Sequence, residues 1–306
     1  MWQDPQKRSS TKDHSGFENV VPFNRLLIAT DFSVPSDTAF EYATSIAVRY
    51  DAQIYVVHVI DSAPFDLIAS EAKSSVLAQT EEEARQKIEC MLTTRRIPSE
   101  RYHIVVTAGA LPGALLDIMR QHQIDLAVLG THGRRKFKKL LMGSVDEEVF
   151  RIAPCPVLNI GPNIGQIVSG PELRHILYPV EFAPDTSEAA RYAVSIAERY
   201  GGKLTLMNVM EDVPASANKR EKFPVPVESW IDEHISRSSG LRSRVYFESG
   251  SGPAPEAILN YASDAAVDLI VLAIHSMDPI IAAHLPNHDT AYEIVRGAPC
   301  PVLTIR

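Results

Sequence analysis

Short apolar runs alternate along this chain with longer segments whose apolar residues recur at helical spacing. In the first half, residues 25–29 and 54–59 are short and largely apolar, which is typical of buried strands. Between them, residues 36–50 place their apolar side chains on one helical face. The other elements predicted in this half are strands at 103–107, 126–129 and 157–160, and helices at 77–96, 112–122 and 144–152.

The alternation of strands and helices predicts the fold class. Strands that are apolar along their whole length need cover on both faces, which a parallel sheet with helices on each side provides. Right-handed crossovers between parallel strands then give a doubly wound α/β fold. In such folds a ligand binds at the carboxyl ends of the strands, at the point where the strand order reverses.

The second half of the chain repeats the first. Residues 42–50 and residues 192–200 are identical at seven of nine positions, and the sequence of residues 153–158 recurs at 298–303. A repeat of this length indicates a duplicated domain rather than a short solenoid unit. We therefore expect two tandem domains of the same doubly wound fold. The predicted division is a disordered tail at 1–22, a first domain at 23–161, a linker at 162–173 and a second domain at 174–306.

The net charge, the lengths of the apolar runs and the cysteine spacing argue against several classes of protein. The formal net charge of −8 disfavours a binder of nucleic acid or of membrane surfaces, because a polyanion would repel the chain on average. No apolar run is long enough to span a bilayer, and the polar N-terminus lacks the apolar segment of a secretory signal. The three cysteines form no CxxC pair. These features favour a cytoplasmic protein.

A glycine-rich loop follows the predicted strand at 126–129. It begins with Gly130 and Gly133, and after nine further residues Gly143 and Ser144 open a helix. Glycines let successive backbone N–H groups approach an anion, and the helix start adds free N–H groups and a positive dipole end. The order of strand, glycine loop and helix favours phosphate binding. The structural alternative makes Gly130 a turn and Ser144 only a helix cap.

Nearby polar residues also have two interpretations. Asp31 follows a buried strand at the predicted switch point, which favours ligand binding, but aspartate also stabilises turns and caps helices. His132 lies inside the loop, where it could touch phosphate, whereas His58 lies on a strand and is expected to be a packed core residue. Arg134 opens a basic run that ends at Lys139. Such a run is either a solvated face or a partner for phosphate, and the sequence favours neither.

These motifs resemble the universal stress protein (UspA) family. The pattern Gly-x2-Gly-x9-Gly-Ser from Gly130 to Ser144 looks like the ATP-binding signature of that family, and residues 26–33 look like its first strand with the acidic turn. Residues 58–61 and 153–158 are similar to the end of its second strand and to its last-strand motif. The resemblance covers nearly all of residues 23–161 and, more weakly, residues 174–306. The chain thus resembles a tandem two-domain member.

The resemblance implies a five-stranded parallel sheet of order 3-2-1-4-5 in each domain, with ATP held between the first and fourth strands. Asp31 would contact the nucleoside, Val59 would offer backbone groups to adenine, and Gly109 would let the nucleotide approach closely. The glycine loop would hold ribose and phosphates, accompanied by Mg²⁺. Taken together, the resemblance and the loop residues predict the cofactor-binding residues Thr30, Asp31, Val59, Gly109, Leu129, Gly130, His132, Gly133, Arg134, Gly143, Ser144 and Val145.

The second half departs from this pattern. By alignment, Ala273 and Ser276 replace the first two loop glycines, and Asp289 replaces Ser144. Added Cβ atoms narrow the path of the ligand and a carboxylate repels phosphate, so we expect the second domain not to bind ATP in the manner of the family. The resemblance also implies an intrachain pseudo-dimer of the two domains through their last strands, and it is compatible with a homodimer of the whole chain.

Three functions are compatible with these patterns. The first is an ATP-binding universal stress protein with a binding or regulatory role in a stress response. The second is a slow ATP hydrolase or a nucleotidyl-transfer enzyme, although the sequence offers no obvious base to position a nucleophile. The third is a scaffold whose two sites are both vestigial. Turnover separates the first two functions, and a thermal shift with nucleotide separates the third from both.

Overall fold

The computed structural model describes residues 21–67, 70–130, 149, 152–165, 171–180, 187–210, 227–274 and 290–306. Its strands form one ten-stranded sheet in the order β3-β2-β1-β4-β5-β10-β9-β6-β7-β8. The strands of the first half are β1 (Arg25–Ala29), β2 (Gln53–Ile60), β3 (Tyr102–Ala108), β4 (Leu126–Gly130) and β5 (Val157–Ile160). Those of the second half are β6 (His175–Pro179), β7 (Lys203–Met210), β8 (Val245–Ser251), β9 (Leu269–Ala273) and β10 (Val302–Ile305).

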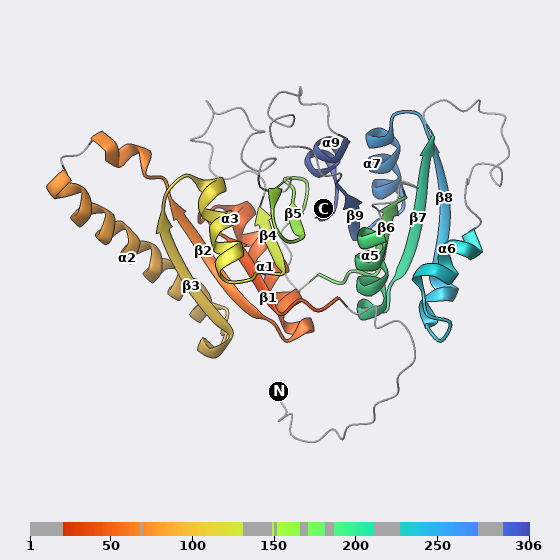
Figure 1. Ribbon diagram of the computed structural model, residues 1–306, viewed down its shortest axis with the longest axis horizontal. Helices are drawn as coiled ribbons and strands as arrows, with labels where there is room; N and C mark the ends of the chain where they lie inside the picture. The colour runs from red at the N-terminus through yellow and green to blue at the C-terminus, as the bar shows by residue number, and fades with distance from the viewer. Residues whose placement is uncertain are drawn as a thin grey trace, which may run out of the picture.

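Each half has the predicted strand order 3-2-1-4-5, with parallel pairing inside the half. The halves meet where β5 pairs antiparallel with β10, with Leu158 opposite Leu303. The two halves consequently lie side by side, and one sheet runs from β3 at one end to β8 at the other (Figure 1). The doubly wound fold and the pairing of the last strands are confirmed, and the two five-stranded sheets are continuous with each other.

Helices cover both faces of this sheet. On one face, α1, α2, α5 and α6 contribute to a single core that extends across both halves. On the other face, α3 covers the first half, and α7 and α9 cover the second (Figure 1). Among the described helices, none combines the length and apolarity needed to cross a bilayer. The helices are α1 (Val34–Tyr50), α2 (Ser70–Thr94), α3 (Leu111–Gln121), α5 (Ser187–Tyr200), α6 (Val227–His234), α7 (Ala254–Asp264) and α9 (Thr290–Gly297).

The element boundaries follow the hydrophobic pattern closely except at α2. This helix begins at Ser70, seven residues before the predicted start, and ends at Thr94. Its first turns carry few apolar residues, so hydrophobic periodicity gives no signal there. At the other end, Arg96 adopts a left-handed φ of 55°, which cannot continue the helix. Of the helix predicted at 144–152, only residues 149 and 152 are described.

A repeated aspartate fixes the start of the first strand in each half. The carboxylate of Asp125 accepts the backbone N–H groups of Asn24 and Arg25 at 2.9 and 3.1 Å. Asp268 accepts two backbone N–H groups in the same way at the start of β6. Burial raises the pKa of Asp125, and these hydrogen bonds oppose that rise. The Asp-Leu repeat in the sequence therefore marks a strand anchor.

The segment before β1 is packed where it is described. Val21 is 7% exposed, and its N–H donates to Ser195 Oγ of the second half at 2.9 Å. Val21 therefore belongs to the packed structure, although it falls inside the tail predicted at 1–22. Leu173, which falls in the predicted linker, is also buried. Residues 1–20 and 166–170 lie outside the described residues, and the division into domains stays a prediction.

We expect the stability of the second half to depend on pH through His175. Its Nδ1 donates to the Ala265 carbonyl, and its Nε2 accepts the Thr205 hydroxyl at 2.9 Å, so the neutral ring satisfies both partners. Burial, with Lys203 nearby, lowers the pKa of His175 below its ordinary value of 6.5, although Asp268 opposes this shift. The folded state thus binds this proton less readily than the unfolded state, and stability falls as pH drops below about 6.5.

The test is urea unfolding of the wild type and of His175→Asn at pH 7.5 and pH 5.5. The variant should lose less stability between the two pH values, because its side chain does not titrate. Equal losses in the two proteins would contradict the assignment to His175.

Candidate functional site

The described candidate residues of the first half meet at one edge of the sheet. Thr30, Val59, Gly109 and Gly130 lie at the carboxyl ends of β1, β2, β3 and β4. Because β1, β2, β3 and β4 are parallel, these ends face the same side. The crossover of strand order falls between β1 and β4, which are hydrogen-bonded neighbours. The described candidate residues therefore lie at one edge of the sheet, and ligand binding there stays a prediction.

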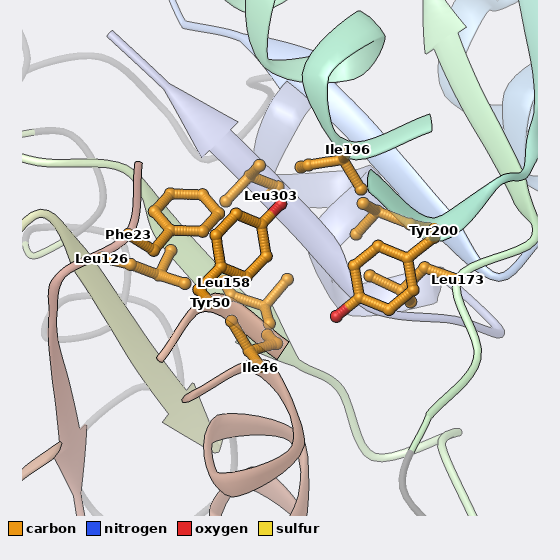
Figure 2. Close-up of a pocket in the computed structure, with 10 residues that line it drawn as sticks. Phe23, Ile46, Tyr50, Leu126, Leu158, Leu173, Ile196, Tyr200 and Leu303 are labelled. Atoms are coloured by element: carbon orange, nitrogen blue, oxygen red, sulfur yellow. The ribbon is translucent and has the colours of Figure 1, made fainter. Parts of the chain in front are cut away.

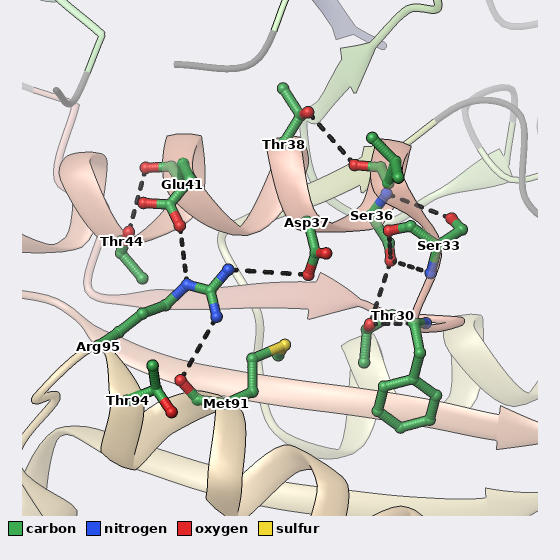
Figure 3. A network of polar contacts seen from close by, with 12 residues as sticks. Thr30, Ser33, Ser36, Asp37, Thr38, Glu41, Thr44, Met91, Thr94 and Arg95 are labelled. Atoms are coloured by element: carbon green, nitrogen blue, oxygen red, sulfur yellow. Dashed lines mark hydrogen bonds and ion pairs between the residues drawn. The ribbon is translucent and has the colours of Figure 1, made fainter. Parts of the chain in front are cut away.

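The turn from β1 into α1 is held by its own polar groups. Thr30 is 5% exposed, and its N–H donates to the Val57 carbonyl at 2.9 Å. Its hydroxyl accepts the Phe32 N–H and lies 3.2 Å from Ser36 Oγ. Figure 3 shows this network around the first turn of α1. Thr30 therefore positions the turn, and its side chain is engaged within the protein.

The acidic residue of this turn has a structural role. Asp31 Oδ1 accepts the Ser33 N–H at 3.0 Å, the geometry of a turn stabilised by aspartate. Ser33 is the N-cap of α1, and it forms a reciprocal capping box with Ser36. The turn-forming role that we set beside ligand binding is thus observed. Asp31 is half-buried at the edge, and a carboxylate can accept several hydrogen bonds at once.

His58 joins the ends of β1 and β2. Its Nδ1 donates to the Thr30 carbonyl at 2.7 Å, because a carbonyl can only accept. Its ring lies 4.7 Å from that of Phe32, and Lys87 Nζ lies 5.6 Å from the centre of the Phe32 ring. Phe32 itself has a left-handed φ of 60°, which is rare for a bulky residue. His58 thus packs against Phe32 and bonds to Thr30, but it is half-buried and does not lie in the core as predicted.

Val59 and Gly109 lie on neighbouring strand ends. Val59 is half-buried and stands in register with Thr107 of β3. The Gly109 N–H donates to the Ile60 carbonyl at 3.0 Å, which closes the end of β2 against β3. A Cβ at Gly109 would meet only the Ala114 side chain, at 3.9 Å. The surface beside Gly109 is therefore open to close approach.

Gly130 is required by the packing of the protein itself. A Cβ at this position would lie 2.7 Å from the Pro35 carbonyl oxygen and 3.0 Å from the Ser36 nitrogen. Real Cβ atoms do not approach backbone so closely, so β4 can lie against the start of α1 only with glycine here. The preceding Leu129 is 5% exposed and packs in the core. Gly130 thus has a structural role that comes from packing against α1, which differs from the turn that we set beside phosphate binding.

The rest of the glycine loop is outside the described residues. This holds for six predicted site residues and for the basic run that follows the second loop glycine. Six of the predicted residues therefore lie at this edge of the sheet. The part of the site that would hold phosphate stays a prediction. The residues outside the described ranges are His132, Gly133, Arg134, Gly143, Ser144 and Val145.

Sequence reasoning missed the helix side of this site. Pro35 and Ser36 form the surface against which Gly130 packs, and Ser36 binds both Ser33 and Thr30. The signal available in the sequence was the Ser33-x-x-Ser36 spacing before a helix, which is compatible with a capping box. The predicted set contained only the strand-end residues.

The second half has the same edge with different residues. Gly252, the counterpart of Gly109, has a φ of 93°, and its N–H donates to the Met210 carbonyl. Val209 stands at the position of Val59, and Ala273 ends β9 where Gly130 ends β4. The strand ends are therefore arranged alike in both halves, but the second half has Ala273 where the first has Gly130. The counterparts of the other loop residues lie outside the described ranges.

The chain is similar to known proteins over most of its length. It matches the Universal stress protein family over residues 22–160 and again over residues 172–306. A universal stress protein of Methanocaldococcus jannaschii is 30% identical over 140 residues, which are 44% of this chain and 81% of that protein. Universal stress protein A homolog 1 of Coxiella burnetii is 33% identical over 144 residues, 45% of this chain and 96% of that protein.

A solved structure shares the arrangement of both halves. The crystal structure of a universal stress protein from Archaeoglobus fulgidus aligns over 94% of this chain and 98% of its own, with a TM-score of 0.71 and 21% identity. At that identity the likeness concerns the fold. The double sequence match covers most of the chain. This chain therefore belongs to the universal stress protein family.

Proposed function

We propose that the first half of this chain binds an adenine nucleotide, namely ATP with Mg²⁺, at the carboxyl edge of β1 and β4. In this proposal the protein is a binding or regulatory component of a stress response rather than a fast enzyme. The observation that carries it is the start of the glycine loop at the end of β4, directly beside the Thr30–Asp31 turn. That place is the switch point, where doubly wound folds bind ligands.

The described residues fit a nucleoside. The Ser33 N–H engages Asp31 at Oδ1, and a carboxylate has capacity to accept ribose hydroxyl groups in addition. The end of β2 at Val59 offers backbone groups of the kind that adenine needs. The open surface at Gly109 admits close contact. The phosphates and their Mg²⁺ would be held by the loop from Gly133 to Ser144, through backbone N–H groups and the following helix start.

Replacing the loop glycines should abolish nucleotide binding. Gly133→Val and Gly143→Val place branched side chains where backbone N–H groups must approach phosphate, so we expect the Kd for MgATP to rise at least ~100-fold. Isothermal titration measures this change. Gly165→Val is a matched control, because a Cβ at Gly165 meets nothing within 4 Å and the residue lies beyond β5. Unchanged affinity in the loop variants would refute the site assignment.

The two other functions make different predictions. An ATP hydrolase or nucleotidyl-transfer enzyme would show fast turnover, whereas the binding protein proposed here shows slow hydrolysis or none. A vestigial scaffold would show no thermal shift with any nucleotide. One preparation of the full chain serves both measurements, since the same sample can be assayed for product and for melting temperature.

The second half is proposed not to bind ATP in this way. Ala273 adds a Cβ where Gly130 has none, and Asp289 would bring a carboxylate to the place of Ser144. Both changes oppose a bound phosphate chain. This half would then serve the first as a structural or regulatory partner, with a single nucleotide bound per chain.

A further inference from the structure

The C-terminal ends of α1 and α5 hold each other reciprocally. Arg49 Nη1 donates to the Arg199 carbonyl at 3.3 Å, and Arg199 Nη2 donates to the Arg49 carbonyl at 2.5 Å. The Arg49 guanidinium lies 4.4 Å from the centre of the Tyr200 ring, and that of Arg199 lies 5.1 Å from the centre of the Tyr50 ring. We call these four residues the Arg–Tyr clasp. The duplication places them at equivalent positions, so the contact is pseudo-symmetric.

The chemistry of the clasp explains why two cations lie on the same seam. Each guanidinium donates to a carbonyl in the last turn of the opposite helix, where the helix dipole is negative. Each also faces an aromatic ring, whose π face attracts a cation. The clasp therefore connects the two halves on the helical face, independently of the β5–β10 pairing.

A small pocket lies beside the clasp. It has a volume of about 20 Å³ and is lined by side chains of both halves, Tyr50 and Tyr200 among them. Figure 2 shows Ile46 and Ile196 on opposite sides of it. The hydroxyl oxygens of Tyr50 and Tyr200 are buried and have no hydrogen-bond partner among the described residues. Burial raises the pKa of Tyr200 to about 12, so this hydroxyl stays neutral. Unsatisfied buried hydroxyls favour any rearrangement that exposes them to water.

The helix α1 connects this seam to the proposed nucleotide site. It is one uninterrupted helix of 17 residues, about 25 Å long. Its first turn contacts Gly130 through Pro35 and binds Thr30 through Ser36. Its last residues form half of the clasp. Arg95, the residue directly after α2, also forms ion pairs with Asp37 and Glu41 of α1 (Figure 3). The helix α1 therefore links the described part of the proposed site, Thr30 and Gly130, to the Arg–Tyr clasp.

We propose that nucleotide occupancy of the first half is coupled to the second half through α1 and the Arg–Tyr clasp. This inference rests on the proposed function. The clasp has two arrangements, one closed as described and one loosened, in which the tyrosine hydroxyls reach water. A nucleotide that fixes the start of α1 favours the closed arrangement, so the end of α5 becomes better ordered. By linkage, closure of the clasp raises nucleotide affinity by the same factor.

Hydrogen exchange of the full chain with and without MgATP tests this coupling. In the wild type we expect exchange of the amides in the last turn of α5, residues 196–200, to slow at least ~5-fold when the nucleotide saturates the site. In the double variant Arg49→Ala/Arg199→Ala, titration should still show binding, but the slowing at α5 should vanish. Arg191→Ala is the matched control, since Arg191 lies on α5 and pairs with Glu188 one turn away on the same helix.

The outcomes separate the two proposals. Binding by the wild type with no change at α5 would overturn the coupling and leave the proposed function intact. Slowing that persists in the clasp variant would also overturn it. No binding of MgATP by the wild type would overturn the proposed function, and the coupling with it. If the double variant fails to fold, the single variant Arg199→Ala provides the same comparison.

Discussion

Asn159→Asp should destabilise this protein by about 3–5 kcal/mol at pH 7, the range for a buried charge without a partner. Asn159 is 1% exposed in β5, at the junction of the two halves. Its Nδ2 donates to the carbonyls of Val157 and Val302 at 3.1 and 3.3 Å, and it also contacts the Thr304 hydroxyl. An aspartate has only oxygen atoms at the end of its side chain, so the hydrogen bonds donated by Nδ2 are lost. Its negative charge would also be repelled by the carbonyl oxygens of Val157 and Val302.

The pH dependence of this variant follows from the same contacts. The carboxyl introduced by Asn159→Asp would be buried and would have a raised pKa, so the folded variant would bind its proton more tightly than the unfolded chain. The deficit of the variant relative to the wild type should therefore shrink as pH falls. Urea unfolding at pH 7 and pH 5 measures both effects.

Asn159→Thr is the matched control for this prediction. Threonine stands at the equivalent position of β10, where the Thr304 hydroxyl donates to the Val157 carbonyl at 3.1 Å. We expect this variant to lose less than about 1.5 kcal/mol, because a donor is kept. A deficit below about 1 kcal/mol for Asn159→Asp at pH 7 would contradict the account of the junction, since burying an unpaired charge costs more than that.

Gly130→Ala should cost about 1–3 kcal/mol of stability, the usual effect of overpacking. The new Cβ would clash with backbone atoms of Pro35 and Ser36, which cannot move away as the end of a flexible side chain can. The start of α1 or the end of β4 must shift to accommodate it. Chemical denaturation of the nucleotide-free protein measures the effect, which by this argument needs no ligand.

Gly113→Ala is the matched control for the same substitution. Gly113 is exposed in α3, and a Cβ there meets nothing within 4 Å. Alanine has the higher helix propensity, so we expect a gain of up to about 1 kcal/mol. The two alanine variants should therefore shift stability in opposite directions. If Gly130→Ala were within about 0.5 kcal/mol of the wild type, below the cost of overpacking, the close contact with α1 would be wrong.

Much of the fold could be predicted from the hydrophobic pattern. The strands at 25–29 and 157–160 agree with β1 and β5 at both ends, because buried parallel strands are apolar throughout. The start of α2 could not be predicted, since its first turns lack an apolar stripe. The buried Asn159 gave no signal either, because a single polar residue in an apolar run says nothing about its partner across the junction.

The candidate site was predicted in part. The strand-end residues Thr30, Asp31, Val59 and Gly130 could be placed at one edge, because parallel strands share a direction. The sequence did not reveal why particular residues occupy their positions. Glycine is needed at position 130 because β4 packs closely against the start of α1. The sequence shows the pair Arg49–Tyr50 as part of the repeat, but only the structure shows that this pair contacts its counterpart in the second half. Both depend on long-range neighbours that no local pattern encodes.

The central claim is an asymmetric pair of related domains, of which one holds a nucleotide. Its most direct test is the number of nucleotides bound per chain when the full protein is saturated with MgATP, measured by titration stoichiometry and by analysis of nucleotide released on denaturation. The account predicts one adenine nucleotide per chain. Two per chain, or none, would contradict it.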